Sequence, residues 1–327
     1  MKKLKYFTST LFRMITLLIA VSILSFILLT SSPIDPLISY IGTEATISEE
    51  AKDEIAAYWG LNNPPAERFL TWAKNTLHGD FGTSIAYKKP VINVIGERFK
   101  YSLLLMITAW VLSGILGFLF GMLSGIYKGS LFDKLTKVFC ITLQSAPTFW
   151  IGLLILSFFS IHLGWFPIGF AAPIGKAAGD ITIWDRLYHL ILPAITLSIL
   201  SIGKITLYTR QKVIEILDCD FILMAKARGE TTFQIIKRHV IRNICLPAIT
   251  EQFSSFSELF GGMALAETVF SYPGLGSATT AAGVKGDVPL LLGIAIFSAI
   301  FVFVGNMTAN ILYSVLDPRV REEVSHD

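Results

Sequence analysis

The chain has 327 residues, of which 53% are hydrophobic and 16% are charged, and its mean hydropathy is +0.62. An ordinary soluble domain is about 25% charged, so this composition excludes a typical soluble globular protein. The net charge of +3 comes without a polar, basic domain, so we also exclude a soluble nucleic-acid-binding protein and expect no nucleic acid as a partner.

Long continuous apolar runs predict an all-α polytopic membrane protein with six transmembrane helices. Lipid admits only helices or closed barrels, and barrel strands would alternate in polarity. The predicted spans are Met14–Thr30, Tyr101–Tyr127, Lys137–Leu163, Tyr188–Tyr208, Leu246–Phe270 and Val288–Leu316. A cleaved signal peptide is the alternative for the first run. We favour an uncleaved span, because the run is long and lacks a small-residue cleavage site.

The distribution of cations between the spans predicts the topology. Phe166–Asp185 and Ser271–Asp287 hold few cations, whereas twelve of the 27 Lys and Arg residues lie in the loops after the second and fourth spans and in the segment after the last span: Lys128, Lys134, Lys137, Arg210, Lys212, Lys226, Arg228, Lys237, Arg238, Arg242, Arg319 and Arg321. The positive-inside rule places these segments and both termini in the cytoplasm. We therefore divide the chain into 1–100, a first span plus an extracytoplasmic region, 101–321, a transmembrane core, and 322–327, a cytoplasmic tail.

Small residues recur on one face of the second predicted span. Gly117, Gly121 and Gly125 follow one another at four-residue spacing. Such a face lets two helices approach closely, so we interpret the three glycines as helix-packing positions.

The cytoplasmic loop after the fourth span has the signals of a helix, a turn and a second helix. Asp220 is suited to cap a helix over 221–228, and Gly229 stands where a left-handed residue ends a helix. Thr231 and Gln234 form a capping box for the second helix. Pro247 is expected in the first turn of the fifth span.

Apolar residues of the second helix lie along one predicted stripe, formed by Phe233, Ile236, Val240 and Ile244. Basic residues lie off that stripe. Two interpretations are open on physical grounds: a hairpin on the membrane surface that meets anionic lipid, or a docking element for a cytoplasmic partner.

The fifth span carries polar groups, with Glu251, Ser255 and Glu258 on one helix face and Lys204 of the fourth span at a compatible depth. Charges in a membrane face protein or water. One interpretation is a structural ion pair between Lys204 and a glutamate. The other is that Glu258 lines a translocation path and favours a cationic cargo. In the last span, Asn306 and Asn310 indicate helix–helix hydrogen bonding.

The chain lacks the patterns of a nucleotide site, a metal site or a catalytic site. No phosphate-binding Gly-x-x-x-x-Gly-Lys-Ser/Thr loop occurs, so we expect that this chain does not itself bind ATP. The scattered histidines and cysteines show no metal-ligand spacing: His78, His162, His189, His239, His326, Cys140, Cys219 and Cys245. We expect no enzyme activity, no cofactor and no metal in this chain.

The segment AKARGETTFQIIKRHVIRNICLPAI resembles the EAA loop of ABC importer permeases, and more narrowly that of the dipeptide/oligopeptide/nickel permease family. There, Ala-x-Ala-x-Gly precedes a basic helix, Arg-Asn and a proline. Six more segments agree in order: GDFGTSI (79–85), ERF (97–99), QSAPTFWIGLLIL (144–156), LPAITL (192–197), ETVFSYPGLG (267–276) and LDPRVR (316–321). Leu223, Met224 and Ala225 replace the Glu-Ala-Ala consensus, and the Gly-Arg often found after GWFPIG (164–169) is absent.

The resemblance implies a permease subunit of an ATP-driven importer for peptides or nickel/metal-chelate complexes, in the inner membrane of a bacterial or archaeal cell. It implies as partners a homologous second permease, two cytoplasmic ATPase subunits that hold ATP and Mg, an extracytoplasmic solute-binding protein and membrane lipid. The coupling loop would cover about 213–245. The implied coupling residues are Asp220, Ala225, Ala227, Arg228, Gly229, Arg242 and Pro247.

Two other classes of function are alternatives. A stand-alone channel or secondary transporter would transport without ATP. A membrane receptor or scaffold would transport nothing in reconstituted vesicles.

Overall fold

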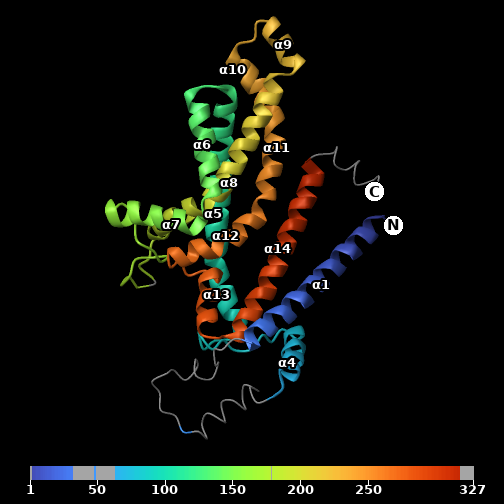
Figure 1. Cartoon of the computed structure of the whole chain (residues 1–327), viewed down its shortest axis with the longest axis vertical. Coiled ribbons are helices and arrows are strands. Elements are labelled where there is room, and N and C mark those ends of the chain that lie inside the picture. The colour runs from blue at the N-terminus through green and yellow to red at the C-terminus, as the bar shows by residue number, and fades with distance from the viewer. Residues whose placement is uncertain (1, 32–47, 49–62, 178, 317–327) are drawn as a thin grey trace. The chain divides into compact units, whose positions relative to one another are not determined.

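The computed structural model describes residues 2–31, 48, 63–177 and 179–316 (Figure 1). Within these ranges the regular secondary structure is helical, with one isolated bridge between Thr83 and Pro90. The helices are α1 (Lys2–Thr30), α4 (Pro65–Leu77), α5 (Val91–Ile126), α6 (Leu131–Ser145), α7 (Thr148–Ile155), the π-helix η1 (Leu156–His162), α8 (Ile183–Leu217), α9 (Asp220–Ala227), α10 (Thr232–Ile235), the π-helix η2 (Ile236–Val240), α11 (Ile241–Ser254), α12 (Phe256–Val269), α13 (Leu275–Val284) and α14 (Val288–Leu316). Arg319, Arg321, His326, the predicted tail and the Asn310 side chain lie outside the description.

Two helices in the described part of the chain are long and apolar enough to cross a membrane, over Val91–Ile126 and Val288–Ala309. Up to four spans result if each bent helix pair counts as one. Within α1, Phe12–Leu28 is a further apolar stretch. The helical, membrane-type architecture is therefore confirmed, while the number of six spans stays a prediction.

The prediction of one continuous third span is wrong. α6 ends at Ser145, and the segment Thr148–His162 continues at an angle of 112° to it. The cause is local: proline disfavours the helical conformation in the residue before it, and Ala146 is extended, with φ −91° and ψ 141°. Pro147 then caps α7.

The fifth predicted span also differs in the structure. It consists of α11 and α12, which are separated at Ser255. The expectation that Pro247 lies in the first turn is wrong, because α11 already begins at Ile241 and places the proline inside the helix. Proline has no N–H, so the carbonyl of Asn243 loses the usual helical donor four residues later.

The chain divides into two compact units, and the first comprises Met1–Ser102 and Pro273–Phe303. Its apolar core joins the start of α5 to α13 and α14 through Val91, Val94, Ile95, Leu275, Ala278, Ala282, Leu290 and Ile294. Asp287 is fully buried; its carboxylate accepts hydrogen bonds from the Ser84 hydroxyl at 2.6 Å and the Ala86 amide at 2.8 Å. This carboxylate also accepts from the Leu290 amide, so it caps α14 and fixes the segment 84–86 to it.

The second unit comprises Leu103–Tyr272 and Val304–Asp327. In it, α6, α7, α11 and α12 all pack against α8. The predicted glycine face is confirmed as a packing surface between α5 and α8. A Cβ on Gly121 would lie 2.6 Å from the Thr206 carbonyl oxygen, and one on Gly125 would lie 2.6 Å from Cβ of Val213. Gly117 faces Ile205 in the same way. The backbones of α5 and α8 approach closely because the three glycines have no side chains.

Candidate functional site

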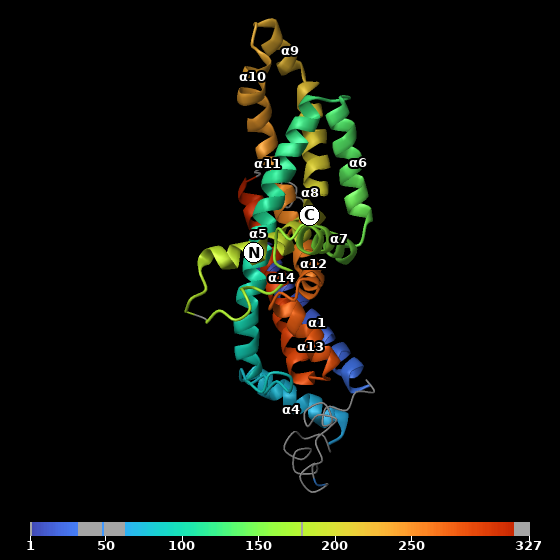
Figure 2. The same cartoon turned by 90° about the vertical axis from the view of Figure 1, so that its left-hand side faces the viewer.

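The segment between α8 and α11 forms a rigid elbow at one end of the second unit, past the turn that joins α5 to α6 (Figures 1 and 2). α9 ends in a Schellman motif: the Glu230 amide donates to the Ala225 carbonyl at 3.2 Å, and the Gly229 amide donates to the Lys226 carbonyl at 2.9 Å. Gly229 has φ +82°, which confirms the predicted left-handed residue. The turn is thus fixed by its own backbone.

The caps at the starts of the two elbow helices were predicted with mixed success. The capping box of α10 is confirmed, because the Gln234 amide donates to the Thr231 hydroxyl and the Thr231 amide to the Gln234 side chain. At α9 the N-cap is Cys219, and Asp220 is the first helical residue. Asp220 therefore acts on the helix dipole and does not cap α9.

A small apolar core lies beneath the elbow and holds it to the ends of the long helices. It contains Val213, Ile222, Ala225, Ile235, Val240 and Ile244. Val240 and Ile244 of the predicted stripe are buried, but Phe233 is 71% exposed and Ile235 takes its place. The π-helix η2 explains the change, because its wider turn alters which residues face inward after Ile235.

The outer face of the elbow is apolar and exposed. Leu223 is 68% exposed and Met224 64%, and Phe221 and Phe233 are exposed beside them in sequence. Basic residues on the same segment are exposed as well, namely Lys226, Arg228, Lys237, Arg238 and Arg242. We call Phe221, Leu223, Met224 and Phe233 the elbow face. It combines an apolar surface with nearby positive charge in the sequence.

Glu230, the residue after the turn glycine, ties the two halves of the elbow together. Its carboxylate lies 3.1 Å from Nε2 of His239 in η2 and 3.5 Å from Arg228. The Phe221 ring lies 6.2 Å from the His239 ring. The role of Glu230 was not predicted, although an acidic residue directly after a left-handed glycine and before a helix cap is a recognisable signal in the sequence.

The polar groups of the predicted fourth and fifth spans meet as an ion cluster. Nζ of Lys204 lies 3.0 Å from Glu258 and 3.3 Å from Glu251, so the structural ion pair is confirmed for both glutamates. The Glu258 side chain is 53% exposed. Ser255, by contrast, is fully buried and donates to the Gln252 carbonyl. The cluster has a net charge of −1 and one half-exposed carboxylate.

Polar side chains also join α12 to α14 within the second unit. The Ser257 hydroxyl donates to the Asn306 side-chain oxygen at 2.5 Å. This confirms the predicted helix–helix hydrogen bonding for Asn306.

A second ionic site lies where α5, α6 and α8 meet, and sequence reasoning missed it. Nε and Nη2 of Arg210 approach the two oxygens of Asp133 at 2.5 and 2.9 Å. The Asp133 side chain is 1% exposed and that of Arg210 is 15% exposed. The cation pattern of the sequence assigns Arg210 only to a cytoplasmic loop. The Ser130-x-x-Asp133 capping pattern in a turn rich in lysine is the sequence signal for its partner.

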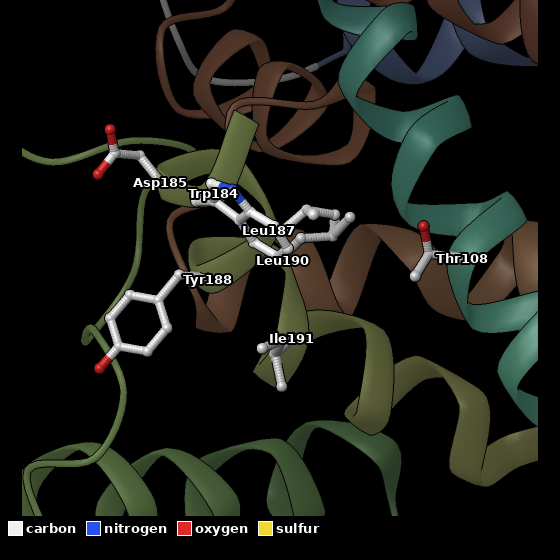
Figure 3. A pocket seen from close by; sticks show the side chains of 7 residues that line it. All are labelled: Thr108, Trp184, Asp185, Leu187, Tyr188, Leu190 and Ile191. Carbon is white, nitrogen blue, oxygen red and sulfur yellow. The ribbon is translucent and has the colours of Figure 1, made fainter. Parts of the chain in front are cut away.

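None of the predicted coupling or pathway residues lines the cavity shown in Figure 3. That cavity has a volume of about 610 Å³ and is bounded by Thr108 of α5 and by Trp184, Asp185, Leu187, Tyr188, Leu190 and Ile191 of α8. Asp185 and Tyr188 point away from Thr108 in this view. The cavity wall is therefore mainly apolar.

The described histidines make other contacts. Nδ1 of His189 lies 2.7 Å from the Gly169 carbonyl oxygen, and Nδ1 of His78 lies 2.8 Å from that of Lys74. Within the described ranges, no three His, Cys, Asp or Glu residues form a group that could hold a metal ion.

Comparison with known proteins gives a consistent set of relatives. Residues 117–322 match the family described as "Binding-protein-dependent transport system inner membrane component". The chain is 34% identical to the oligopeptide transport system permease protein AppB of Bacillus subtilis (strain 168), covering 94% of this chain and 96% of the relative. It is 31% identical to a putative peptide permease protein of Brucella suis biovar 1 (strain 1330), with 93% and 95% covered.

A solved structure of the MetNI methionine ABC transporter, in an inward-facing conformation, gives a TM-score of 0.49 at 14% identity. The match covers 69% of this chain and 97% of that chain.

Proposed function

Because the chain belongs to the family of binding-protein-dependent transport system inner membrane components, we propose that it is a membrane-spanning permease subunit of an ATP-driven importer for peptides or nickel/metal-chelate complexes. The relatives reported above are peptide permeases by name, which supports a peptide cargo. The proposed assembly contains a homologous second permease, two cytoplasmic ATPase subunits and an extracytoplasmic solute-binding protein. ATP and Mg bind to the ATPase subunits, so this chain carries no cofactor.

The observation that supports this function most strongly is the exposed elbow face on a locked elbow. Leu223 and Met224 project from α9, while Ile222 and Ala225 of the same helix are fully buried in the core beneath. Large apolar side chains exposed together indicate a surface for a partner. A Schellman turn and a capping box fix the backbone beneath this surface, so a force applied to the surface can be transmitted without deforming the elbow. We therefore propose that the elbow face docks into a groove on an ATPase subunit.

The membrane-surface hairpin is the other interpretation of this segment. A helix lying on lipid needs an apolar face and basic flanks, and the elbow has both. It does not need the backbone-fixed turn or the Glu230–His239 contact. These features favour docking.

The six-span topology with cytoplasmic termini is part of the proposal. Within the second unit, Nζ of Lys128 in the α5–α6 turn lies 3.8 Å from Asp218, next to the elbow. Two of the cation-rich loops thus lie at the same end of the helices, as the positive-inside rule requires of cytoplasmic loops.

We propose that Glu251, Ser255 and Glu258 contribute to the translocation path at some stage of the cycle. In the structure Glu258 is half-exposed, and the cluster it shares with Lys204 and Glu251 is net negative. A half-exposed carboxylate in a span faces protein or water. A cationic group on the cargo would be its natural counter-ion.

The docking proposal is tested with a substitution on the elbow face and a matched control. Leu223→Asp places a charge on the proposed contact, and Leu77→Asp changes a leucine of α4 that is also exposed, at 87% against 68%, and lies far from it in sequence. We expect Leu223→Asp to abolish co-purification of the ATPase subunits and ATP-driven uptake, and Leu77→Asp to retain both. Full assembly and uptake in the Leu223→Asp complex would contradict docking through this face.

The alternative function, a stand-alone channel or secondary transporter, is distinguished from the importer by an uptake measurement in vesicles. Vesicles that contain this chain without ATPase subunits should take up no cargo. Uptake that persists without ATP and without ATPase subunits would favour the alternative.

A further inference from the structure

The carboxylate of Asp133 has a complete set of partners in a buried position. It accepts the Ser124 hydroxyl at 2.6 Å and the Gly129 amide at 2.9 Å, in addition to both nitrogens of Arg210. Ser124 belongs to α5, Gly129 to the α5–α6 turn, Asp133 to α6 and Arg210 to α8. One carboxylate therefore joins three helices and the turn between two of them. We call Ser124, Gly129, Asp133 and Arg210 the carboxylate clamp.

One member of the clamp, Arg210, lies on the helix that leads into the elbow. Arg210 stands two turns before the end of α8 at Leu217, and α9 begins at Asp220. A second contact reinforces the link, because Lys128 of the α5–α6 turn lies 3.8 Å from Asp218. Any displacement of the elbow that moves the end of α8 thus acts directly on the clamp.

We propose that Asp133 and Arg210 are positioning residues that make α5 and α6 follow α8 when an ATPase subunit moves the elbow. The inference rests on the proposed function, since it needs an elbow that receives force. The clamp touches neither cargo nor nucleotide in this proposal. It transmits movement from α8 to the helix that ends at the 112° bend before α7.

The geometry of the pair explains why it serves this purpose better than a single ion contact. Two parallel N–H···O bonds between a planar guanidinium and a carboxylate resist rotation as well as separation. A lysine ammonium is a point charge on a flexible stem and would allow both motions. Burial also shields the pair from water, so dissolved salt screens it less than an exposed ion pair.

The first test compares cargo transported per ATP hydrolysed in the reconstituted importer. Arg210→Lys retains the charge but loses the two-bond geometry, and Asp133→Asn retains the shape but loses the charge. Lys212→Gln is the matched control: it removes an exposed ion pair with Glu215 on the same helix. We expect the first two variants to hydrolyse ATP yet transport about tenfold less cargo per ATP, and Lys212→Gln to match the unaltered importer.

An unchanged ratio of cargo to ATP in both clamp variants would overturn the inference. A purely structural pair would lower hydrolysis and uptake together in proportion to the folded complex that remains, and that result would overturn it as well.

The second test leaves the four clamp residues unaltered, so it does not depend on the folding of a clamp variant. A spin label on the exposed native Cys219 and another at Lys134→Cys report the distance between the start of α9 and α6. Cys140 and Cys245 are replaced by alanine, and ATP-driven uptake of the labelled importer is verified first. We expect one narrow distance distribution that stays the same in the ATP-bound and ATP-free states.

The mild variant Ser124→Ala removes one bond to Asp133 and should broaden that distribution. A distance that changes between nucleotide states while the clamp is intact would show that α6 does not follow α8. If the unaltered importer takes up cargo without ATP, the proposed function fails. If uptake needs ATP and the labelled helices move apart, only the positioning role fails.

Discussion

Lys204 and Arg210 both belong to helix α8, and the two sites they form differ in almost every respect. Arg210 makes two bonds to one carboxylate that is 1% exposed and has two further donors. Lys204 makes single contacts to two glutamates, and Glu258 is 53% exposed. Both sites pair a cation of α8 with carboxylate groups on other helices, yet one site is closed to water and the other is open.

The difference shows why a charged pair in a membrane protein does not by itself indicate a function. In a closed pair, all hydrogen-bonding positions are used within the protein, so the pair cannot bind a ligand and instead holds the helices in place. An open pair with excess negative charge can exchange a protein partner for a cationic group of the cargo. Burial and the number of donors per carboxylate separate the two cases.

Asp133→Ala should have the largest effect, because it leaves the Arg210 guanidinium buried without its carboxylate. Breaking a buried ion pair by removing one partner costs about 3–5 kcal/mol. We expect a large drop in the thermal unfolding midpoint of the purified chain in detergent. A drop no larger than that of Glu258→Ala would remove the distinction between closed and open sites.

Gly121→Ala should have the next largest effect, because the closed site depends on the close approach of α5 to α8. The added Cβ would lie 2.6 Å from the Thr206 carbonyl oxygen and 2.7 Å from Cβ of Thr209. Overpacking of this kind costs about 1–3 kcal/mol. The matched control is Gly261→Ala in α12, where nothing lies within 4 Å. Equal unfolding midpoints for the two variants would contradict the packing argument.

Gly229→Ala tests the elbow, whose turn, like the closed site, is fixed by internal hydrogen bonds. The added Cβ meets nothing within 4 Å, so the cost comes from the backbone alone, at φ +82°. A left-handed conformation costs a non-glycine residue about 1–2 kcal/mol. We expect a modest loss of stability and a lower ratio of cargo to ATP.

Gly229→Pro should abolish coupling, because it also removes the amide that donates to the Lys226 carbonyl.

Glu258→Gln should change stability least and transport selectively. An exposed ion pair contributes about 0–1 kcal/mol, so the unfolding midpoint should stay within that range. Uptake of cationic cargo should fall relative to neutral cargo, as measured by competition in vesicles. Glu251→Gln is the companion variant, with a less exposed side chain and a larger expected loss of stability. Unchanged uptake of every cargo in an assembled Glu258→Gln complex would remove Glu258 from the path.

The sequence predicted local features well where the signal is carried by neighbouring residues. Gly229, the Thr231–Gln234 capping box and the limits of α14 follow from residues within a turn or a single helix. Prediction failed where a local break interrupted a long apolar run. Pro147 divides the third predicted span, and the helix that contains Pro247 begins earlier than expected. Apolar periodicity does not register such breaks, because both sides of them remain apolar.

The sequence by itself determined that this is a helical membrane protein with a basic, capped elbow, because hydropathy, charge asymmetry and caps are properties of short segments. Only the tertiary structure decided which charges meet. Asp133 and Arg210 are 77 residues apart, and Lys204 and Glu258 are 54 residues apart. The burial of these charges depends on how closely α5, α6 and α12 pack around α8, and this burial makes one site closed and the other open. Such packing is a property of the assembled helices and of no segment alone.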